Sequence, residues 1–206
     1  MRILVSVLCG YERHGWLNPE LVTFLMALAR EKNEVVISLN TDTTPVERAR
    51  NFSARQALEL GADWLLMLDN DIMPPANILR VLDGAGPDQH IILLPYWGVL
   101  DGIPAIHVMG ENAVRVVPHS GFQEIRAGGT GAIFIQRRVL ETLRKPHFSM
   151  RLSDDGLKVI MGEDFDFCEK ARKRGFRIWT HGDFPVEHLH VFQLGYLAKA
   201  LNFSSR

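Results

Sequence analysis

The sequence is poor in cysteine and has no long apolar run. Its two cysteines, Cys9 and Cys168, lie far apart and outside any Cys-x-x-Cys pair, which argues against a disulfide framework and against a zinc cluster. We expect both to be buried, reduced thiols. No stretch approaches the ~18 apolar residues of a membrane span. The apolar N-terminus is too short for a signal peptide and is typical of a first strand.

An excess of charge is also missing. The chain has 23 Lys and Arg against 24 Asp and Glu, a formal net charge of −1, so it lacks the basic surplus of nucleic-acid-binding proteins. Hydrophobic residues make up 47% of its 206 residues, which is enough for the core of one compact domain. We therefore expect a soluble, cytoplasmic protein with no transmembrane segment and no nucleic-acid partner. Peripheral membrane contact stays open.

The spacing of apolar residues predicts alternating strands and helices in the first half. The expected strands cover 3–8, 34–39, 65–68 and 91–95, and the expected helices cover 18–30, 46–60 and 75–82. Asn18-Pro19 is typical of a helix start, and Gly61 of a helix end. This order predicts an α/β fold with a mostly parallel central sheet and helices on both faces.

The second half has a less regular pattern. Residues 96–127 mix short apolar runs with Gly, Pro and His, and we expect no long helix there; residues 145–162 are expected to form a long loop. The remaining expected elements are strands at 132–135, 177–180 and 186–191 and helices at 138–144, 163–174 and 192–201. No repeat or linker indicates a second unit, so we expect residues 1–206 to form a single domain.

Two carboxylates end the apolar strand in the segment Asp-Trp-Leu-Leu-Met-Leu-Asp-Asn-Asp, residues 63–71. In open α/β sheets, ligands bind beyond the carboxyl ends of the strands. On an extended backbone, residues i and i+2 project to one side, so Asp69 and Asp71 are expected to face a common ligand. Hard oxygen ligands suit Mg²⁺ or Mn²⁺ bound together with substrate phosphates. The alternative is an ordinary turn, because Asp and Asn favour turns and Pro74-Pro75 follows.

A second acidic block, Glu163-Asp164-Phe165-Asp166, opens the helix expected at 163–174. Acids in a first turn stabilise a helix by ~0.3–1 kcal/mol, which is one explanation for them. The other is a general base that faces the metal pocket and activates an acceptor hydroxyl. His188 and His190, on one face of a short strand, could add an imidazole ligand of the kind that Mn²⁺ accepts. Local hydrogen bonding is the alternative for these histidines.

Two further motifs allow ligand contact. Arg50 and Asn51 lie beside a polar loop and could hold phosphate or the polar edge of a nucleotide, although a solvated helix face is the common alternative. The segment Gly128-Gly129-Thr130-Gly131 could let backbone approach a ligand closely. It is neither a Walker A loop nor a Rossmann fingerprint, because the following Lys-Ser/Thr and the G-x-G-x-x-G spacing are both missing.

Together these blocks resemble the GT-A glycosyltransferases, in particular small family-2-like enzymes. The resemblance lies in four ordered segments: ERARNFSARQALELGADWLLMLDNDIMPP, AGGTGAIFIQRRVLETL, GEDFDFCEKARKRGFRIW and VEHLHV. It implies a Rossmann-like GT-A domain and a nucleotide-sugar donor held by Mn²⁺ or Mg²⁺. Asp69 and Asp71 match the metal-binding Asp-x-Asp motif, with Asp71 favoured as direct ligand. His188 or His190 matches a histidine ligand, and the choice between them is open.

The same resemblance assigns the remaining site residues. Asp164 matches the base of inverting members, with Glu163 as the fallback. Donor-side positions match Cys9, Gly10, Arg50, Asn51, Asp69 and Asn70, and acceptor-side positions match Gly129, Thr130 and Gly131. Residues 1–95 are thus the expected nucleotide-sugar-binding half, and residues 96–206 the expected acceptor-binding and catalytic half.

The implied activity is transfer of a sugar from a nucleotide-diphosphate sugar, with UDP- or GDP-sugars favoured, to a hydroxyl of a glycan, lipid-linked or protein acceptor. One alternative is a nucleotidyltransferase acting on sugar phosphates, but such enzymes usually carry a glycine-rich basic loop after the first strand. A phosphatase would place Asp-x-Asp after that strand. A non-catalytic nucleotide-sugar-binding module is the third alternative, and the joint retention of the acidic and histidine residues speaks against it.

Overall fold

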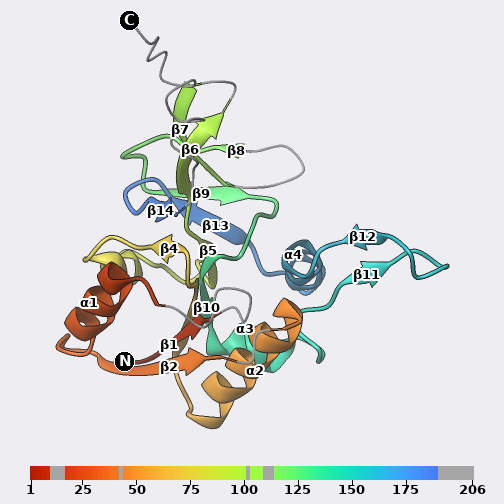
Figure 1. Cartoon of the computed structure of the whole chain (residues 1–206), viewed down its shortest axis with the longest axis horizontal. Coiled ribbons are helices and arrows are strands. Elements are labelled where there is room, and N and C mark those ends of the chain that lie inside the picture. The colour runs from red at the N-terminus through yellow and green to blue at the C-terminus, as the bar shows by residue number, and fades with distance from the viewer. Residues whose placement is uncertain (10–16, 42–43, 101–102, 109–113, 190–206) are drawn as a thin grey trace, which may run out of the picture.

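The computed structural model describes residues 1–9, 17–41, 44–100, 103–108 and 114–189 (Figure 1). Its central element is a seven-stranded sheet with the order β2-β1-β3-β10-β5-β13-β9. The strands of this sheet are β1 (Arg2–Leu8), β2 (Glu34–Asn40), β3 (Trp64–Asp69), β5 (Ile91–Leu93), β9 (Phe122–Ile125), β10 (Ala132–Gln136) and β13 (Ile178–His181).

Most strands of this sheet run in one direction. β1 pairs in parallel with β2 and β3, and β13 pairs in parallel with β5. β10 lies between β3 and β5 and is antiparallel to both, and β9 is antiparallel to β13. The expected mostly parallel sheet is therefore confirmed. The reversed β10 was not foreseen, because an apolar run reports burial and not direction.

Helices cover both faces of the sheet, as expected. α1 (Pro19–Leu28) and the 3₁₀ helix η2 (Ile78–Leu82) pack on one face, and α2 (Val46–Glu59), α3 (Arg137–Thr142) and α4 (Glu163–Lys173) pack on the other. Each face of the sheet packs against its own apolar core, and the alternating side chains of the central strands contribute to both cores. In β3, Leu65 and Met67 join the core beneath α2, whereas Leu66 and Leu68 join the core beneath α1. Full burial on both faces explains the continuous apolar runs.

The predicted helix ends carry the expected local contacts. The Asn18 side chain accepts a hydrogen bond of 2.8 Å from the backbone N–H of Glu20, and Pro19 opens α1. Gly61 follows α2 and Gly175 follows α4, at φ values of +60° and +86° that favour glycine. The helix expected at 75–82 is shorter and of 3₁₀ type, and the one expected at 192–201 lies outside the described residues.

A second sheet lies beyond the strand ends and was not predicted. It has the order β4-β14-β6-β7-β8, built from β4 (Ile72–Met73), β14 (Val186–His188), β6 (Tyr96–Leu100), β7 (Ile103–Val108) and β8 (Val114–Arg115). The expected loop at 145–162 is also corrected, since it contains a hairpin of β11 (Arg151–Leu152) and β12 (Val159–Met161). Strands of two or three residues are too short to show a period.

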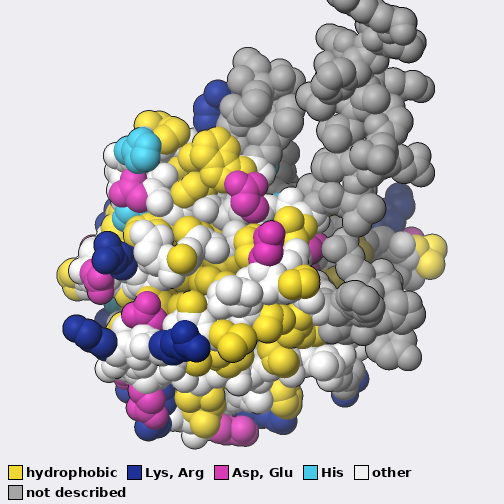
Figure 2. All heavy atoms as spheres, turned by 60° about the vertical axis from the view of Figure 1, so that its left-hand side comes forward, with side chains coloured by type: hydrophobic (Ala, Val, Ile, Leu, Met, Phe, Trp, Pro, Cys, Tyr) yellow, Lys and Arg dark blue, Asp and Glu magenta, His cyan; other side chains and the backbone are white. Residues whose placement is uncertain are grey.

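The described surface matches the balanced composition. On the face shown in Figure 2, Lys and Arg side chains alternate with Asp and Glu, and apolar side chains lie between them. No helix within the described ranges combines the length and the apolar character that crossing a bilayer requires.

The packing of the core predicts that truncating two phenylalanines will have different effects on stability. Phe134 in β10 is fully buried and contacts Trp64 edge-on, whereas Phe52 on α2 is 38% exposed. Phe134→Ala should lower the free energy of unfolding by ~3–5 kcal/mol because it leaves a cavity. Phe52→Ala, the matched control, should cost about 1 kcal/mol or less. Urea unfolding followed by circular dichroism measures both, and equal losses would contradict this packing.

Candidate active site

A buried guanidinium joins three distant parts of the sequence. Arg50 on α2 is 4% exposed and reaches the carboxyl end of β3, where its Nη2 lies 3.3 Å from Oδ2 of Asp69. Its Nε lies 3.3 Å from Oε1 of Glu163, at the start of α4, and its Nη1 donates to the Thr130 carbonyl at 3.0 Å. We call this set of four residues the Arg50 junction. It brings together the predicted donor-side, acceptor-side and catalytic blocks.

The charges of the junction depend on one another. Burial lowers the pKa of the Arg50 guanidinium, but the carboxylates of Asp69 and Glu163 raise it, so that the net direction is upward. Burial raises the pKa of the Asp69 carboxyl, Arg50 lowers it and the nearby Asp71 raises it, and the net direction is again upward. Arg50 is the most deeply buried of these charges, since the Asp69 and Glu163 side chains are 31% and 12% exposed, so losing either carboxylate would leave the Arg50 charge less well compensated.

Asp71 has a different partner from Asp69. The chain leaves the extended conformation after Asp69 and turns at residues 70–71, so the expectation that both carboxylates project to one side does not apply. Asp71 lies 3.4 Å from His188, measured from Oδ2 to Nε2. The pairing of β4 with β14 fixes this approach, since His188 lies opposite Ile72 and the Leu189 N–H donates to the Asp71 carbonyl at 2.8 Å.

These residues fit a divalent cation. Two ligand atoms that each lie ~2.1 Å from one ion can be up to ~4.2 Å apart, and the Asp71–His188 separation of 3.4 Å is within that limit. Oδ1 of Asp69 is buried without a hydrogen-bond partner. Within the described ranges, no three His, Cys, Asp or Glu side chains already form a complete metal cage. The remaining ligands would therefore come from water or from a bound phosphate, as Mg²⁺ sites commonly require.

Tyr96 is a site residue that sequence analysis missed. It opens β6, is 4% exposed, and its ring centroid lies 5.6 Å from that of His188. Burial and the neighbouring Asp69 carboxylate raise the pKa of its phenol. A Cβ atom on Gly131 would lie 2.6 Å from the Tyr96 hydroxyl and 3.1 Å from Oδ2 of Asp69. Glycine at 131 thus lets the phenol and the carboxylate approach, and nothing in the local sequence marks Tyr96.

The acids of α4 have separate environments. Glu163 belongs to the Arg50 junction. Asp166 is 2% exposed, lies 2.8 Å from Nε of Arg151 and accepts from the Ser149 hydroxyl at 2.7 Å, so it holds the chain at the foot of the β11–β12 hairpin. Arg151, Ser149 and Lys170 lower the pKa of Asp166 against the opposing effect of burial. Two of the three acids are therefore already engaged in ion pairs.

Asp164 differs from both neighbours because, within the described residues, it makes no ion pair. It is half-buried, and its Oδ1 accepts from the Phe165 N–H at 2.8 Å. Burial raises the pKa of Asp164, and the Glu163 charge adds to this, while the Phe165 N–H and Arg50 oppose it. The net direction is upward, which is the direction that improves a general base.

The other predicted donor-side residues have mainly internal contacts. Nδ2 of Asn51 donates at 2.7 Å to the carbonyls of Glu47 and Phe148, and its Oδ1 accepts from the Phe148 N–H, so both ends of the amide bind backbone. Cys9 is 1% exposed, and its N–H donates to the Asn40 carbonyl.

The remaining predicted positions divide into those near the junction and those not described. Gly131 accepts from the Asp69 N–H at 2.8 Å, and Gly129 precedes Thr130 in the same segment. Asn70 lies in the turn between the two carboxylates. Gly10 and His190 lie outside the described residues, and the structure places His188 beside Asp71.

Comparison with known proteins identifies the fold. No family model and no curated protein matches the chain. Among solved structures, A197 from STIV aligns with a TM-score of 0.66 at 21% identity, covering 93% of this chain and 87% of that one. GalNAc-T7, crystallised with UDP, GalNAc and Mn²⁺, aligns with a TM-score of 0.56 at 16% identity. The alignment covers 93% of this chain and 44% of GalNAc-T7.

A third solved structure has a similar fold. Drosophila β1,4-galactosyltransferase 7, in complex with manganese, UDP-Gal and xylobiose, aligns with a TM-score of 0.52 at 13% identity, covering 93% of this chain and 72% of that one. The chain thus has the GT-A fold, as the resemblance predicted. It spans less than half the length of GalNAc-T7.

The close approach at Gly131 can be tested by a double-mutant cycle. Gly131→Ala should destabilise the protein by about 1–3 kcal/mol, because the new methyl group overlaps the Tyr96 hydroxyl. Tyr96→Phe removes that oxygen and should recover part of the loss, so the two changes should be non-additive in thermal or urea unfolding. Gly84→Ala, whose Cβ would meet Phe122 at an ordinary 3.6 Å, is the control. Additive losses would exclude contact through the hydroxyl.

Proposed function

We propose that this protein is a metal-dependent glycosyltransferase that moves a sugar from a nucleotide-diphosphate sugar to an acceptor hydroxyl with inversion at the anomeric carbon. The observation that carries the proposal is the pairing of Asp71 with His188 beside the Arg50 junction, on a GT-A fold. Carboxylate, imidazole and a half-buried second carboxylate, Asp164, are the groups that this chemistry needs.

The proposed metal site rests on the chemistry of the side chains that would bind the ion. Asp71 and His188 would hold Mn²⁺ or Mg²⁺, and the unpartnered Oδ1 of Asp69 would accept from a coordinated water or from the donor. When bound, the ion would neutralise the diphosphate that leaves with the nucleotide. Arg50 would keep Asp69 fixed and charge-balanced while the donor enters. GalNAc-T7 and galactosyltransferase 7 were crystallised with manganese and uridine nucleotides, which supports a similar donor here.

The two halves of the chain would bind different substrates. Residues 1–95 would bind the donor, a UDP- or GDP-sugar, through Cys9 and Gly10, which follow β1, and through Arg50 and Asn70. Asn51 would support the donor side indirectly, because both ends of its amide bind backbone. Residues 96–206 would bind a glycan, lipid-linked or protein acceptor, with the Gly129–Gly131 segment beside it. The Arg50 junction would hold the halves in register, because it joins α2 and β3 to α4.

Asp164 would be the general base. Of the three acids that open α4, Glu163 is bound to Arg50 and Asp166 to Arg151, so Asp164 is the carboxylate that can accept a proton from an acceptor hydroxyl. Such bases typically contribute ~10²–10⁴-fold to rate. Holding the hydroxyl in line with the anomeric carbon can add ~7–11 kcal/mol in favourable cases.

Two substitutions should separate binding from chemistry. Asp71→Ala should abolish Mn²⁺-dependent stabilisation by nucleotide diphosphates, because it removes the carboxylate that faces His188. Asp164→Asn should keep that stabilisation and lose transfer by ~10²-fold or more. A thermal-shift panel of UDP, GDP, CDP and dTDP with and without Mn²⁺ measures the first, and release of nucleotide diphosphate measures the second. Ligand at 100 times its Kd adds ~2.7 kcal/mol, which is readily detected.

The controls distinguish the competing functions. Asp166→Asn should lower stability without selectively removing metal-dependent binding, since its partners are Arg151 and Ser149. Binding without transfer by the unaltered protein would indicate a non-catalytic module, and release of pyrophosphate from a nucleoside triphosphate would indicate a nucleotidyltransferase. An active Asp164→Asn enzyme would overturn the assignment of the base.

The rate should also depend on pH in a defined direction. The raised pKa of Asp164 means that this carboxyl takes up its proton at a higher pH than an ordinary Asp, whose pKa is 3.8. As pH falls through the raised value, kcat should fall, because the protonated carboxyl cannot accept a proton. Protonation of Asp69 could also change the rate by weakening donor binding. The affinity for the donor is therefore measured at each pH as a control. A kcat that stays constant down to about pH 4 would contradict this assignment.

A further inference from the structure

The environment of Glu47 on α2 is not explained by the fold. Glu47 lies in the first turn of α2, is half-buried, and its Oε2 is buried without a hydrogen-bond partner among the described residues. Acids in a first turn stabilise a helix through its dipole, which is the ordinary explanation for such a residue. The dipole does not require a buried oxygen, however, and a buried acceptor is costly unless a ligand or water supplies a donor.

The direction of α2 places Glu47 at the edge of the sheet where the candidate active site lies. α2 connects β2 to β3, and both strands run parallel to β1, so α2 runs opposite to them and begins at their carboxyl ends. Glu47 precedes Arg50 by three positions and therefore lies one turn nearer to that edge on the same side of the helix. Helix side chains lean toward the N-terminus, which directs the Glu47 carboxylate further toward the ligand edge.

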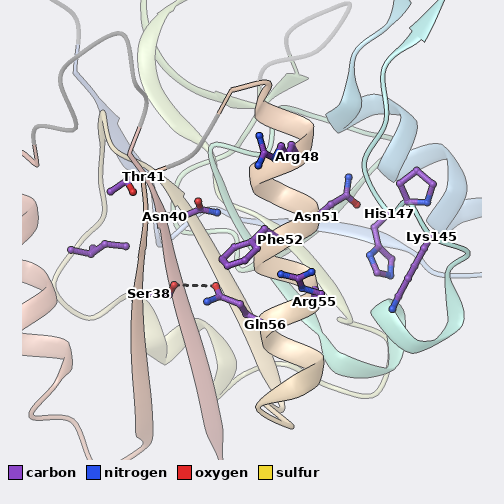
Figure 3. A pocket seen from close by; sticks show the side chains of 12 residues that line it. Ser38, Asn40, Thr41, Arg48, Asn51, Phe52, Arg55, Gln56, Lys145 and His147 are labelled. Atoms are coloured by element: carbon purple, nitrogen blue, oxygen red, sulfur yellow. Dashed lines mark hydrogen bonds between the residues drawn. The ribbon is translucent and has the colours of Figure 1, made fainter.

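The angular position of Glu47 on the helix is set by two neighbours. With about 3.6 residues per turn, Glu47 lies between Arg50 and Asn51 when α2 is viewed along its axis. Arg50 reaches Asp69, whereas Asn51 points to the segment after α3, where its Oδ1 accepts from the Phe148 N–H at 3.1 Å (Figure 3). Glu47 therefore faces the space between the Arg50 junction and that segment.

Unsatisfied polar atoms gather in this region. Five buried side-chain atoms lack a hydrogen-bond partner in the described ranges, and three of them belong to Glu47, Asp69 and Thr130. Asp69 and Thr130 both contact Arg50, and Glu47 lies one turn from it. Two of these atoms are carboxylate oxygens, which only accept, and the third is a hydroxyl oxygen. A ligand that satisfies the carboxylates must donate hydrogen bonds, as sugar hydroxyls do and ionised phosphates do not.

We propose that Glu47 accepts a hydrogen bond from a hydroxyl of the transferred sugar, and that its charge selects neutral donor sugars over sugars that carry a carboxylate. This inference rests on the proposed function, in which Asp71 and His188 would hold the ion that binds the diphosphate. The sugar is bonded directly to that diphosphate, and Asp69 lies two positions before Asp71 at the same strand end. A sugar carboxylate beside Glu47 would face a like charge in a partly buried site, where repulsion is stronger than in water.

Calorimetric titration of the whole chain in Mn²⁺ tests this contact. The probes are UDP, UDP-glucose, UDP-galactose, UDP-N-acetylglucosamine and UDP-glucuronate, with GDP and GDP-mannose as a second set. Glu47→Ala should weaken binding of the preferred neutral nucleotide sugar about tenfold, which corresponds to ~1.4 kcal/mol, because a hydrogen bond to a charged group is lost. Binding of the nucleotide diphosphate alone should change by less than about twofold, and its retention verifies that the variant is folded.

Glu47→Gln tests the selection by charge. The amide keeps the shape and one acceptor oxygen but is neutral. The preference for UDP-glucose over UDP-glucuronate should therefore fall by about threefold or more in this variant. Glu59→Ala is the matched control, because Glu59 is an exposed acid at the other end of α2 that lies 3.6 Å from Arg55. The control should leave all of these affinities unchanged.

The outcomes distinguish this inference from the proposed function. Equal weakening of nucleotide diphosphate and nucleotide sugar by Glu47→Ala would assign Glu47 to the stability of α2 and would overturn the inference while the proposed function stands. Unchanged affinity for every nucleotide sugar, or an equal effect of Glu59→Ala, would overturn it as well. An undiminished preference for UDP-glucose in Glu47→Gln would overturn the selection by charge. Absence of Mn²⁺-dependent binding of every probe to the unaltered protein would overturn the proposed function and the inference together.

Discussion

The buried guanidinium of Arg50 is the interaction on which the candidate active site depends. It contacts one carboxylate at the end of β3, another at the start of α4, and the carbonyl of Thr130. The Arg50 guanidinium could not be buried alone at low cost, because a charge removed from water needs a partner of opposite sign. These contacts join segments separated by more than a hundred positions at one point.

The second sheet adds the Asp71–His188 pair to the candidate active site. Its strands β4 and β14 are only two and three residues long, yet their pairing brings Asp71 to His188. Tyr96 from β6 lies between this pair and the Arg50 junction, and Gly131 leaves the space for it. The large central sheet therefore supports a small, irregular one whose side chains line the candidate active site, a division that is common where function lies at strand ends.

Acidic and basic residues that look equivalent in the sequence differ in burial and in ion-pair partners in the structure. Glu163 balances Arg50, Asp166 holds the foot of the hairpin, and Asp164 is left with a raised pKa and no ion pair in the described structure. On α2, Arg50 is buried in the junction, whereas Arg55 is exposed and lies 3.6 Å from Glu59. Helix periodicity separates their directions, and burial separates their chemistry.

Local sequence patterns were sufficient to predict several elements of the fold. The two-sided apolar runs predicted β1, β3 and β10, the Asn18 and glycine signals predicted helix ends, and the acidic blocks identified Asp69, Asp71 and Asp164 as candidates. Contacts between distant segments were needed to show the reversal of β10, the second sheet, the β11–β12 hairpin, the approach of His188 to Asp71, and the positions of Arg50 and Tyr96. Periodicity and capping act over a few neighbouring residues, whereas strand direction and ion pairing are settled by contacts between residues far apart in the chain.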